Sequence, residues 1–186
     1  MIMTALLFPT AALLSATMAL FYPNAAMEIT SGFTMENIIP LLFVLAVMPS
    51  IAEELSFRGA ILTASEGMSI RNAAILNGVL FGLIHMNPQQ IPYATFLGIV
   101  FALFVLHTKS IFSSILAHFV VNAPNVLLAV LAASFPSEVQ EAASAGTNDA
   151  ILPAMIVLAV IATFCYLGFL YVFNRFKLHN IQRHSD

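Results

Sequence analysis

Long apolar runs, separated by short segments of turn-forming residues, dominate this chain of 186 residues. A run of about 20 apolar residues can cross the hydrocarbon core of a bilayer as a helix, and Pro, Gly and Asn mark the breaks between runs. The segment 86–90 lies between two of the shorter runs and predicts a tight membrane hairpin. The whole pattern predicts six membrane-spanning helices, at residues 3–22, 38–62, 73–87, 91–107, 110–133 and 151–173.

The composition agrees with this pattern, since 60% of the residues are hydrophobic and only 8% are charged. Soluble domains contain about 25% charged residues. We therefore predict an all-α, polytopic membrane helix bundle in a single domain, residues 1–186. The single cysteine, Cys165, excludes an internal disulfide. The absence of a basic stripe and of a phosphate-binding glycine loop argues against a nucleic-acid partner. Within the domain we expect an N-terminal span and loop at 1–37, a core at 38–133, and a loop, last span and tail at 134–186.

The basic residues predict the orientation of the bundle. If the six spans alternate in direction, all six Lys and Arg residues lie on one side of the membrane. The opposite loops, 23–37, 88–90 and 134–150, contain neither residue type. By the positive-inside rule the chain is a multi-pass protein of the cell membrane with both termini in the cytoplasm. The first span lacks the positively charged start of a secretory signal peptide, so we expect it to be retained as an anchor.

Two adjacent carboxylates interrupt the second predicted span. Glu53 and Glu54 lie with Arg58 in an otherwise apolar run, where a charge costs several kcal/mol on even the mildest scale. Glu54 and Arg58 are four residues apart and can pair on one helix face. Glu53 is rotated by about 100° from Glu54 and has no partner in its own helix, which suits a general base. The alternative is that both glutamates only pair with cations that hold helices together.

Two further spans carry polar groups at a similar depth. His118 and Asn122 are one helical turn apart and can direct two hydrogen-bond donors toward one point, whereas His85 stands alone in its span. At about 1.5 Å of rise per residue, Glu53, His85 and His118 lie roughly 14, 18 and 12 Å from the cytoplasmic ends of their spans. We therefore predict one polar site near the middle of the membrane. Asn and His can also join helices without any catalytic role, and we assign His107, at a span end, to that group.

Gly78 and Gly82 form a face of small residues on the third predicted span. Such faces allow the backbones of two membrane helices to approach closely. We expect this contact to bring His85 near the neighbouring spans.

Three runs, EELSFRG at 53–59, FGLIH at 81–85 and SILAHFVVNAP at 114–124, resemble a known family. They are similar to the three motifs of the CPBP intramembrane peptidases, also called the ABI or type II CAAX prenyl endopeptidase family. The resemblance covers about residues 40–130. It implies proteolysis inside the membrane, with catalytic positions at Glu53, His85, His118 and Asn122 and motif companions at Glu54 and Arg58. Bacterial relatives are linked to processing of peptides and membrane proteins and to bacteriocin self-immunity. With six predicted spans the chain is shorter than its eukaryotic relatives, which cleave prenylated proteins.

The residues are consistent with two versions of this hydrolysis. In the favoured version no cofactor is required: Glu53 and His85 activate a water molecule, and His118 and Asn122 donate to the oxyanion. In the alternative, zinc is held by Glu53, His85 and His118 with water at the open position, although the compact His-Glu-x-x-His spacing is absent. The expected partners are the lipid bilayer and a membrane-associated peptide or protein substrate.

Two readings from other classes remain open. A bacteriocin self-immunity or scaffold protein could keep the fold without catalysis, but nothing would oblige it to retain all the polar side chains. A proton-coupled transporter also buries Glu and His at mid-membrane. Transporters of that kind usually contain internal repeats and broken helices, and we find neither pattern in this sequence.

Overall fold

A computed structural model describes most of the chain, namely residues 9–14, 16–17, 33–135, 156–157, 159–161, 163–165, 167–168 and 171–172. All the regular structure in these residues is helical, which confirms the all-α prediction. The elements are η1 (Met35–Asn37), α2 (Ile38–Leu42), η2 (Phe43–Val47), α3 (Met48–Glu54), η3 (Leu55–Ile61), η4 (Thr63–Ser65), α4 (Ile70–Ile84), α5 (Ile91–Thr108) and α6 (Ile111–Ala133).

Among the residues that the structure describes, three helical segments are long and apolar enough to cross a membrane: Met35–Ser65, which comprises η1 to η4, then α5 and α6. They correspond to the second, fourth and fifth predicted spans. The third predicted span corresponds to α4, which is apolar but only 15 residues long. The structure describes only parts of the predicted spans at 3–22 and 151–173. The count of six spans therefore stays a prediction.

The first long helix departs from regular α-helix in two places. Both η2 and η3 are π-helical, with each N–H bonded five residues back, and η2 ends two residues before Pro49. Proline has no N–H and cannot make the usual bond to the carbonyl four residues earlier, which favours a change of register there. In η3 the carbonyl of Phe57 accepts from Leu62 N and also from Asn77 Nδ2 of α4, at 2.8 Å each. This hydrogen bond links α4 to the π-helical segment, and it is shielded from solvent because Asn77 is fully buried.

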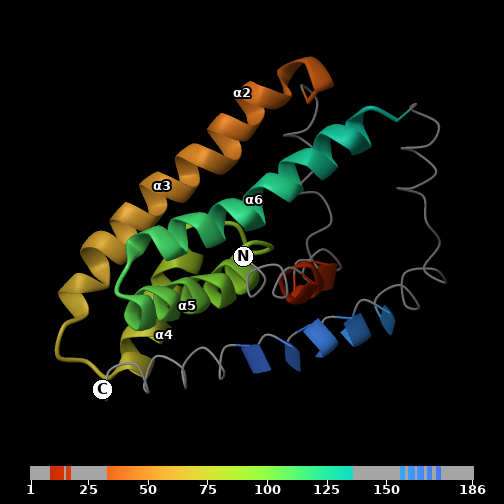
Figure 1. Cartoon of the computed structure of the whole chain (residues 1–186). Helices are drawn as coiled ribbons and strands as arrows, with labels where there is room; N and C mark the ends of the chain where they lie inside the picture. The colour runs from red at the N-terminus through yellow and green to blue at the C-terminus, as the bar shows by residue number, and fades with distance from the viewer. Residues whose placement is uncertain are drawn as a thin grey trace.

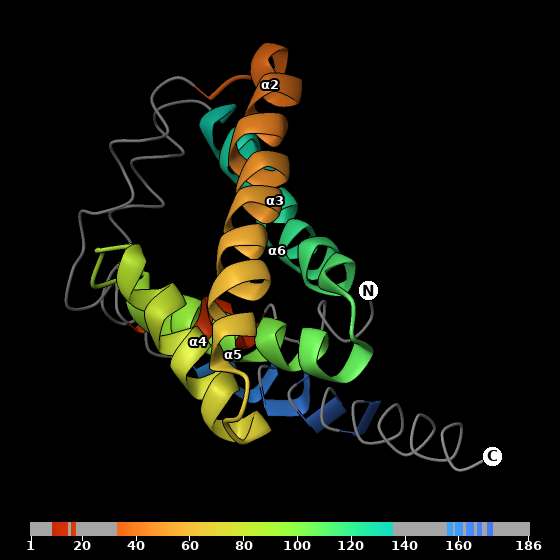
Figure 2. The ribbon, with the colours of Figure 1, turned by 90° about the vertical axis from the view of Figure 1, so that its left-hand side faces the viewer.

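Helices α4 and α5 form the predicted tight hairpin and lie side by side in both ribbon views (Figures 1 and 2). The glycine face of α4 makes this possible. A Cβ placed on Gly78 would lie 2.6 Å from the backbone nitrogen of Ile99, and one on Gly82 would lie 2.8 Å from the carbonyl oxygen of Ile91. Across the interface, a Cβ on Gly98 would lie 2.9 Å from the Cα of Gly78. The close approach predicted for Gly78 and Gly82 is thus confirmed.

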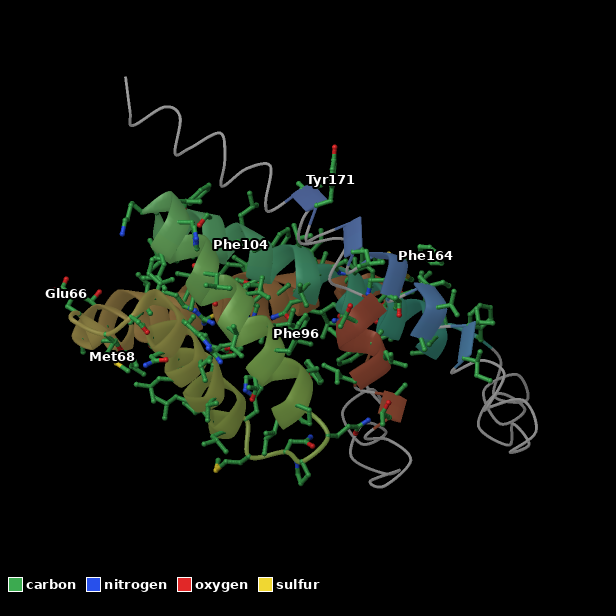
Figure 3. All side chains as sticks on the ribbon, turned by 90° about the horizontal axis from the view of Figure 1, so that it is seen from below. Glu66, Met68, Phe96, Phe104, Phe164 and Tyr171 are labelled. Carbon is green, nitrogen blue, oxygen red and sulfur yellow. The ribbon has the colours of Figure 1, made fainter. Side chains whose placement is uncertain are left out.

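Short turns connect the long helix to the hairpin and the hairpin to α6. The turn after η4 contains Gly67, whose φ of 91° is readily available only to glycine. Glu66 and Met68 flank it at one outer edge of the molecule (Figure 3). Lys109 caps α5 in the left-handed conformation, and α6 begins two residues later. From there α6 runs back against α2, η2 and α3.

Polarity is distributed as expected for a protein surrounded by lipid. Large apolar side chains are exposed on the outer faces of the helices, among them Ile39, Phe43 and Phe112, while ionisable and amide groups are buried between helices. A soluble monomer rarely exposes so many large apolar residues. In a bilayer the same faces contact acyl chains, and polar side chains turn toward the bundle interior. These features together identify a membrane protein.

Candidate functional site

A fully buried ion pair forms the base of the site. Nη1 of Arg58 donates to Oε1 of Glu54 at 2.9 Å, and neither side chain has any exposed surface. The predicted pairing of Glu54 with Arg58 one turn later is therefore confirmed. The second guanidinium nitrogen, Nη2, donates to the carbonyl of Gly98 in α5 at 2.8 Å. The pair thus links the first long helix to the α4–α5 hairpin.

Aromatic rings surround the guanidinium group. Its central carbon lies 4.5 Å from the ring centroid of Phe81 and 5.5 Å from that of Phe101. A cation over an aromatic face is stabilised by the ring quadrupole, and more so where water is excluded. Phe81 comes from α4 and Phe101 from α5, so Arg58 is held by three helices at once.

His118 of α6 completes this buried network. Its Nδ1 lies 3.0 Å from Oε1 of Glu54, the same oxygen that accepts from Arg58. Its ring stacks on Phe101, with centroids 5.3 Å apart and planes at 29°. Because a carboxylate paired with arginine can only accept, we assign the proton on the near side of His118 to Nδ1. Nε2 is then the nitrogen available for other partners.

Glu53 lies on the open side of His118. Oε2 of Glu53 is 3.9 Å from Nε2 of His118, and it is buried without a hydrogen-bond partner among the described residues. The Glu53 side chain remains 33% exposed, in contrast to the fully buried Glu54. The two adjacent glutamates therefore occupy different surroundings, one sealed in the core and one at a cavity.

That cavity has a volume of about 600 Å³. Glu53, His85, His118 and Asn122 all contribute to its lining, so the structure brings together the residues that the sequence placed at one depth. The lining also includes residues from the N-terminal segment, η2, α3, α4, the turn between α4 and α5, α5 and α6: Ala11, Ala12, Ala16, Leu45, Pro49, Phe81, Gln89, Gln90, Tyr93, Ala94, Leu97, Phe101, Val121, Asn125 and Val126.

His85 is fixed at the end of α4. Its Nδ1 lies 2.8 Å from the carbonyl of Phe81, which can only accept, so Nδ1 carries the proton and Nε2 is left for a ligand. From the sequence, Glu53 and His85 are predicted to activate one water molecule together. In the described ion pairs Glu53 instead lies against His118, while His85 shares the cavity lining. For His107, to which the sequence assigns a packing role, Nδ1 lies 2.8 Å from the carbonyl oxygen of Leu103.

Sequence reasoning missed the residues that hold this site together. Phe81 was recognised only as part of a motif, and the roles of Phe101, Gly98 and Asn77 were not anticipated. One signal was available for Asn77, an amide inside an apolar run four residues before Phe81. Phe101 and the carbonyl of Gly98 carry no such signal, because they act through their position in the fold.

The zinc alternative can be compared with this arrangement. A catalytic zinc ion needs about three protein ligands at roughly 2.0–2.2 Å from the metal. Across the described residues, no three His, Cys, Asp or Glu side chains are grouped so that they could hold a metal ion. Glu53, His85 and His118 therefore do not form a ready ligand set in this arrangement.

The fold and the site define a helical membrane protein with a cavity, lined by both polar and apolar side chains, between its apolar helices. Residues 35–124 match the family model described as Type II CAAX prenyl endopeptidase Rce1-like. This segment contains all six candidate residues, and the match supports the CAAX protease-like family. At family level it supports a protease-like membrane hydrolase. No curated protein and no solved structure shows a significant match to the chain.

The first prediction concerns the buried pair. Glu54→Gln leaves Arg58 charged and uncompensated, which should lower the free energy of unfolding by about 3–5 kcal/mol. Unfolding in mixed detergent micelles, followed by circular dichroism, measures this loss. The double variant Glu54→Gln/Arg58→Met removes both charges and should recover part of it.

Glu66→Gln provides the matched control, since Glu66 is exposed in a turn and its change should stay within about 0.5 kcal/mol. If Glu54→Gln instead kept normal stability and lost all turnover, Glu54 would belong to the chemistry and not to the support.

Proposed function

We propose that this protein is an intramembrane endopeptidase that hydrolyses a peptide bond of a membrane-associated peptide or protein. The observation that carries the proposal is the shared cavity, which Glu53, His85, His118 and Asn122 line from three different helices. A cavity of about 600 Å³ is within the range of small-ligand sites and can hold a few residues of peptide. The family match supports hydrolysis as the reaction.

Glu53 serves as the general base in this proposal. Its carboxylate is partly exposed to the cavity, has a buried oxygen without a hydrogen-bond partner among the described residues, and is not neutralised by Arg58. It takes a proton from a water molecule, while Nε2 of His85 accepts a hydrogen bond from the same water and orients it. The oxygen of that water then attacks the carbonyl carbon of the scissile bond.

His118 and Asn122 stabilise the oxyanion that forms. The side-chain amide of Asn122 donates directly, and removal of one such donor in well-studied hydrolases costs about 2.7–4 kcal/mol of transition-state stabilisation. Because Nδ1 of His118 already donates to Glu54, a donor role for this ring requires a second proton, on Nε2. The role of Glu54 is then to hold His118 in place.

Collapse of the tetrahedral intermediate breaks the carbon–nitrogen bond. The leaving nitrogen needs a proton, and the protonated Glu53 supplies the one that it took from water. The base is thereby regenerated, and the products are a carboxylic acid and an amine. Every proton in this cycle moves between water, the substrate and side chains of the chain itself.

The second prediction tests these roles. Glu53→Gln, which preserves shape, should reduce the hydrolysis rate by about 10²–10⁴-fold, and Asn122→Ala should reduce kcat by about 10²–10³-fold. Turnover is measured with purified protein in nanodiscs and a library of neutral apolar decapeptides, with products identified by mass spectrometry. In parallel, membrane and secreted peptides of cells carrying wild-type protein or Glu53→Gln are compared.

Asn72→Ala is the control for the amide, because Asn72 is exposed on α4 and does not line the cavity. Wild-type rates in Glu53→Gln, His85→Gln and Asn122→Ala together would show that the assignment is wrong.

The third prediction concerns metal. In the favoured version purified protein contains no stoichiometric zinc, and a chelator leaves turnover unchanged. Elemental analysis of wild-type protein and of His85→Gln makes the comparison. Stoichiometric zinc that is present in wild-type protein and lost in His85→Gln would establish the zinc alternative.

The fourth prediction concerns orientation in the cell membrane. We propose a multi-pass protein with both termini cytoplasmic. Because α4 and α5 pack as a hairpin, Arg71 near the start of α4 and Lys109 at the end of α5 lie toward the same end, as the positive-inside rule requires. An alkaline phosphatase fused after Tyr171 should be inactive, and a fluorescent protein fused there should be active. The reverse result would overturn the topology.

A further inference from the structure

The four candidate residues bring only one free hydrogen-bond donor to the cavity. Glu53 can only accept while it is a carboxylate. His85 and His118 each direct Nδ1 at an acceptor, so Nε2 of each neutral ring is an acceptor as well. Among these four, the amide of Asn122 is therefore the one donor that needs no extra proton. Because oxyanions are commonly held by more than one donor, we searched the lining for a second one that already carries its proton.

Tyr93, in the first turn of α5, brings a phenol to the same cavity. Its side chain is hydrogen-bonded to that of Gln90, which also lines the cavity. This contact stabilises negative charge on the phenol oxygen, so the amide nitrogen of Gln90 is the donor. A phenol that accepts one hydrogen bond can still donate its own, and it is protonated at neutral pH. Tyr93 thus has an anchored oxygen and a free proton.

Packing fixes the ring of Tyr93 between the helices that carry the candidate residues. On one side the ring packs against a buried cluster that includes Val121 of α6. On the other side it packs against a cluster that includes Phe57 of the first long helix and Phe81 of α4. Of the described partly buried residues, only Tyr93 packs against both clusters. The phenol is therefore held between α6, which carries Asn122, and the two helices that position the attacking water.

The carboxylate of Glu53 lies near enough to act electrostatically on the phenol of Tyr93. In the proposed reaction Glu53 becomes neutral when it takes a proton from water, and the negative charge moves to the carbonyl oxygen of the substrate. A donor that faces the carboxylate before this step faces the oxyanion after it. The position of the phenol thus suits the place where charge develops.

Two other side chains of the lining carry amide donors. Asn125 is exposed, and its Nδ2 already donates to the carbonyl of Val121 at 3.0 Å. Gln89 lies in the turn between α4 and α5, and a glutamine side chain loses much rotamer freedom when it is fixed. The ring of Tyr93 is already fixed by packing and by Gln90. Donors that are preorganised in this way stabilise an oxyanion without reorganisation during the reaction.

We propose that Tyr93 is a further catalytic residue, whose phenol donates a hydrogen bond to the oxyanion of the tetrahedral intermediate together with the amide of Asn122. The phenol keeps its proton throughout, and no covalent bond of Tyr93 is made or broken. His118 can then stay neutral, held by Glu54. This inference rests on the proposed hydrolysis, but its test also has a binding readout that does not.

Tyr93→Phe removes the phenol oxygen and keeps the packed ring. With one cleaved peptide from the library described above, we expect kcat to fall about 10²–10³-fold. KM should change by less than about three-fold, because the planar carbonyl of the substrate gains little from an oxyanion donor. Tyr171→Phe is the matched control, since Tyr171 is exposed and outside the lining, and it should keep the wild-type kcat. A wild-type kcat in Tyr93→Phe, with or without a higher KM, would overturn the proposal.

Unfolding in mixed micelles separates this role from a structural one. Tyr93→Phe should unfold within about 1 kcal/mol of wild-type protein, because the ring and its packing are retained. If the loss of kcat only matches a loss of folded protein, Tyr93 is structural and the inference is wrong.

A tetrahedral anion tests the contact without turnover. In a fluorescent tetrapeptide of Ala and Val, a phosphinate replaces the central peptide bond and imitates the intermediate, and the parent tetrapeptide serves as the control ligand. Both are titrated in the Glu53→Gln background, which prevents turnover and imitates the protonated base. Adding Tyr93→Phe should weaken phosphinate binding at least about ten-fold and binding of the parent by less than about three-fold.

These titrations distinguish the two possible failures. If wild-type protein cuts no peptide and Tyr93→Phe still weakens phosphinate binding, the proposed hydrolysis is wrong and the donor role of Tyr93 toward an anion holds. Equal phosphinate affinity with and without Tyr93→Phe, or no phosphinate binding in either case, overturns the inference, whether or not hydrolysis occurs.

Discussion

The buried pair between Glu54 and Arg58 is the interaction on which the rest of the site depends. A guanidinium group without exposed surface, in a chain surrounded by lipid, can stay charged only with a carboxylate beside it. Oε1 of Glu54 accepts from both Arg58 and His118, and Arg58 reaches the backbone of α5. One carboxylate oxygen thus fixes the relative positions of three helices. Glu53 is left out of this network, which is why it is free to act at the cavity.

Close backbone contact between α4 and α5 is the second constraint. Glycines at 78, 82 and 98 let the two helices touch, so α5 presents the Gly98 carbonyl to Arg58 and α4 presents Phe81 to its other side. A side chain at any of these glycines would push the hairpin apart and open the aromatic enclosure of the ion pair. The π-helical stretch η3, held by Asn77, sets the register of Arg58 within the same enclosure.

The two glutamates also differ in the charges around them. The guanidinium group of Arg58 pairs with Glu54 inside the core. Among the described residues, no Lys or Arg lines the cavity that Glu53 lines. A site built in this way keeps one negative charge beside several amides.

The sequence by itself determined the all-α class, the helix positions within 35–133, the pairing of Glu54 with Arg58 and the shared level of Glu53, His85, His118 and Asn122, because apolar length and four-residue spacing are local properties. It did not reveal that both glutamates lie against His118, that the rings of Phe81 and Phe101 surround Arg58, or that Gly98 and Asn77 form their hydrogen bonds. Those depend on contacts between residues 20 to 64 positions apart. Only the packing of α4, α5 and α6 against the first long helix brings such groups within hydrogen-bonding distance.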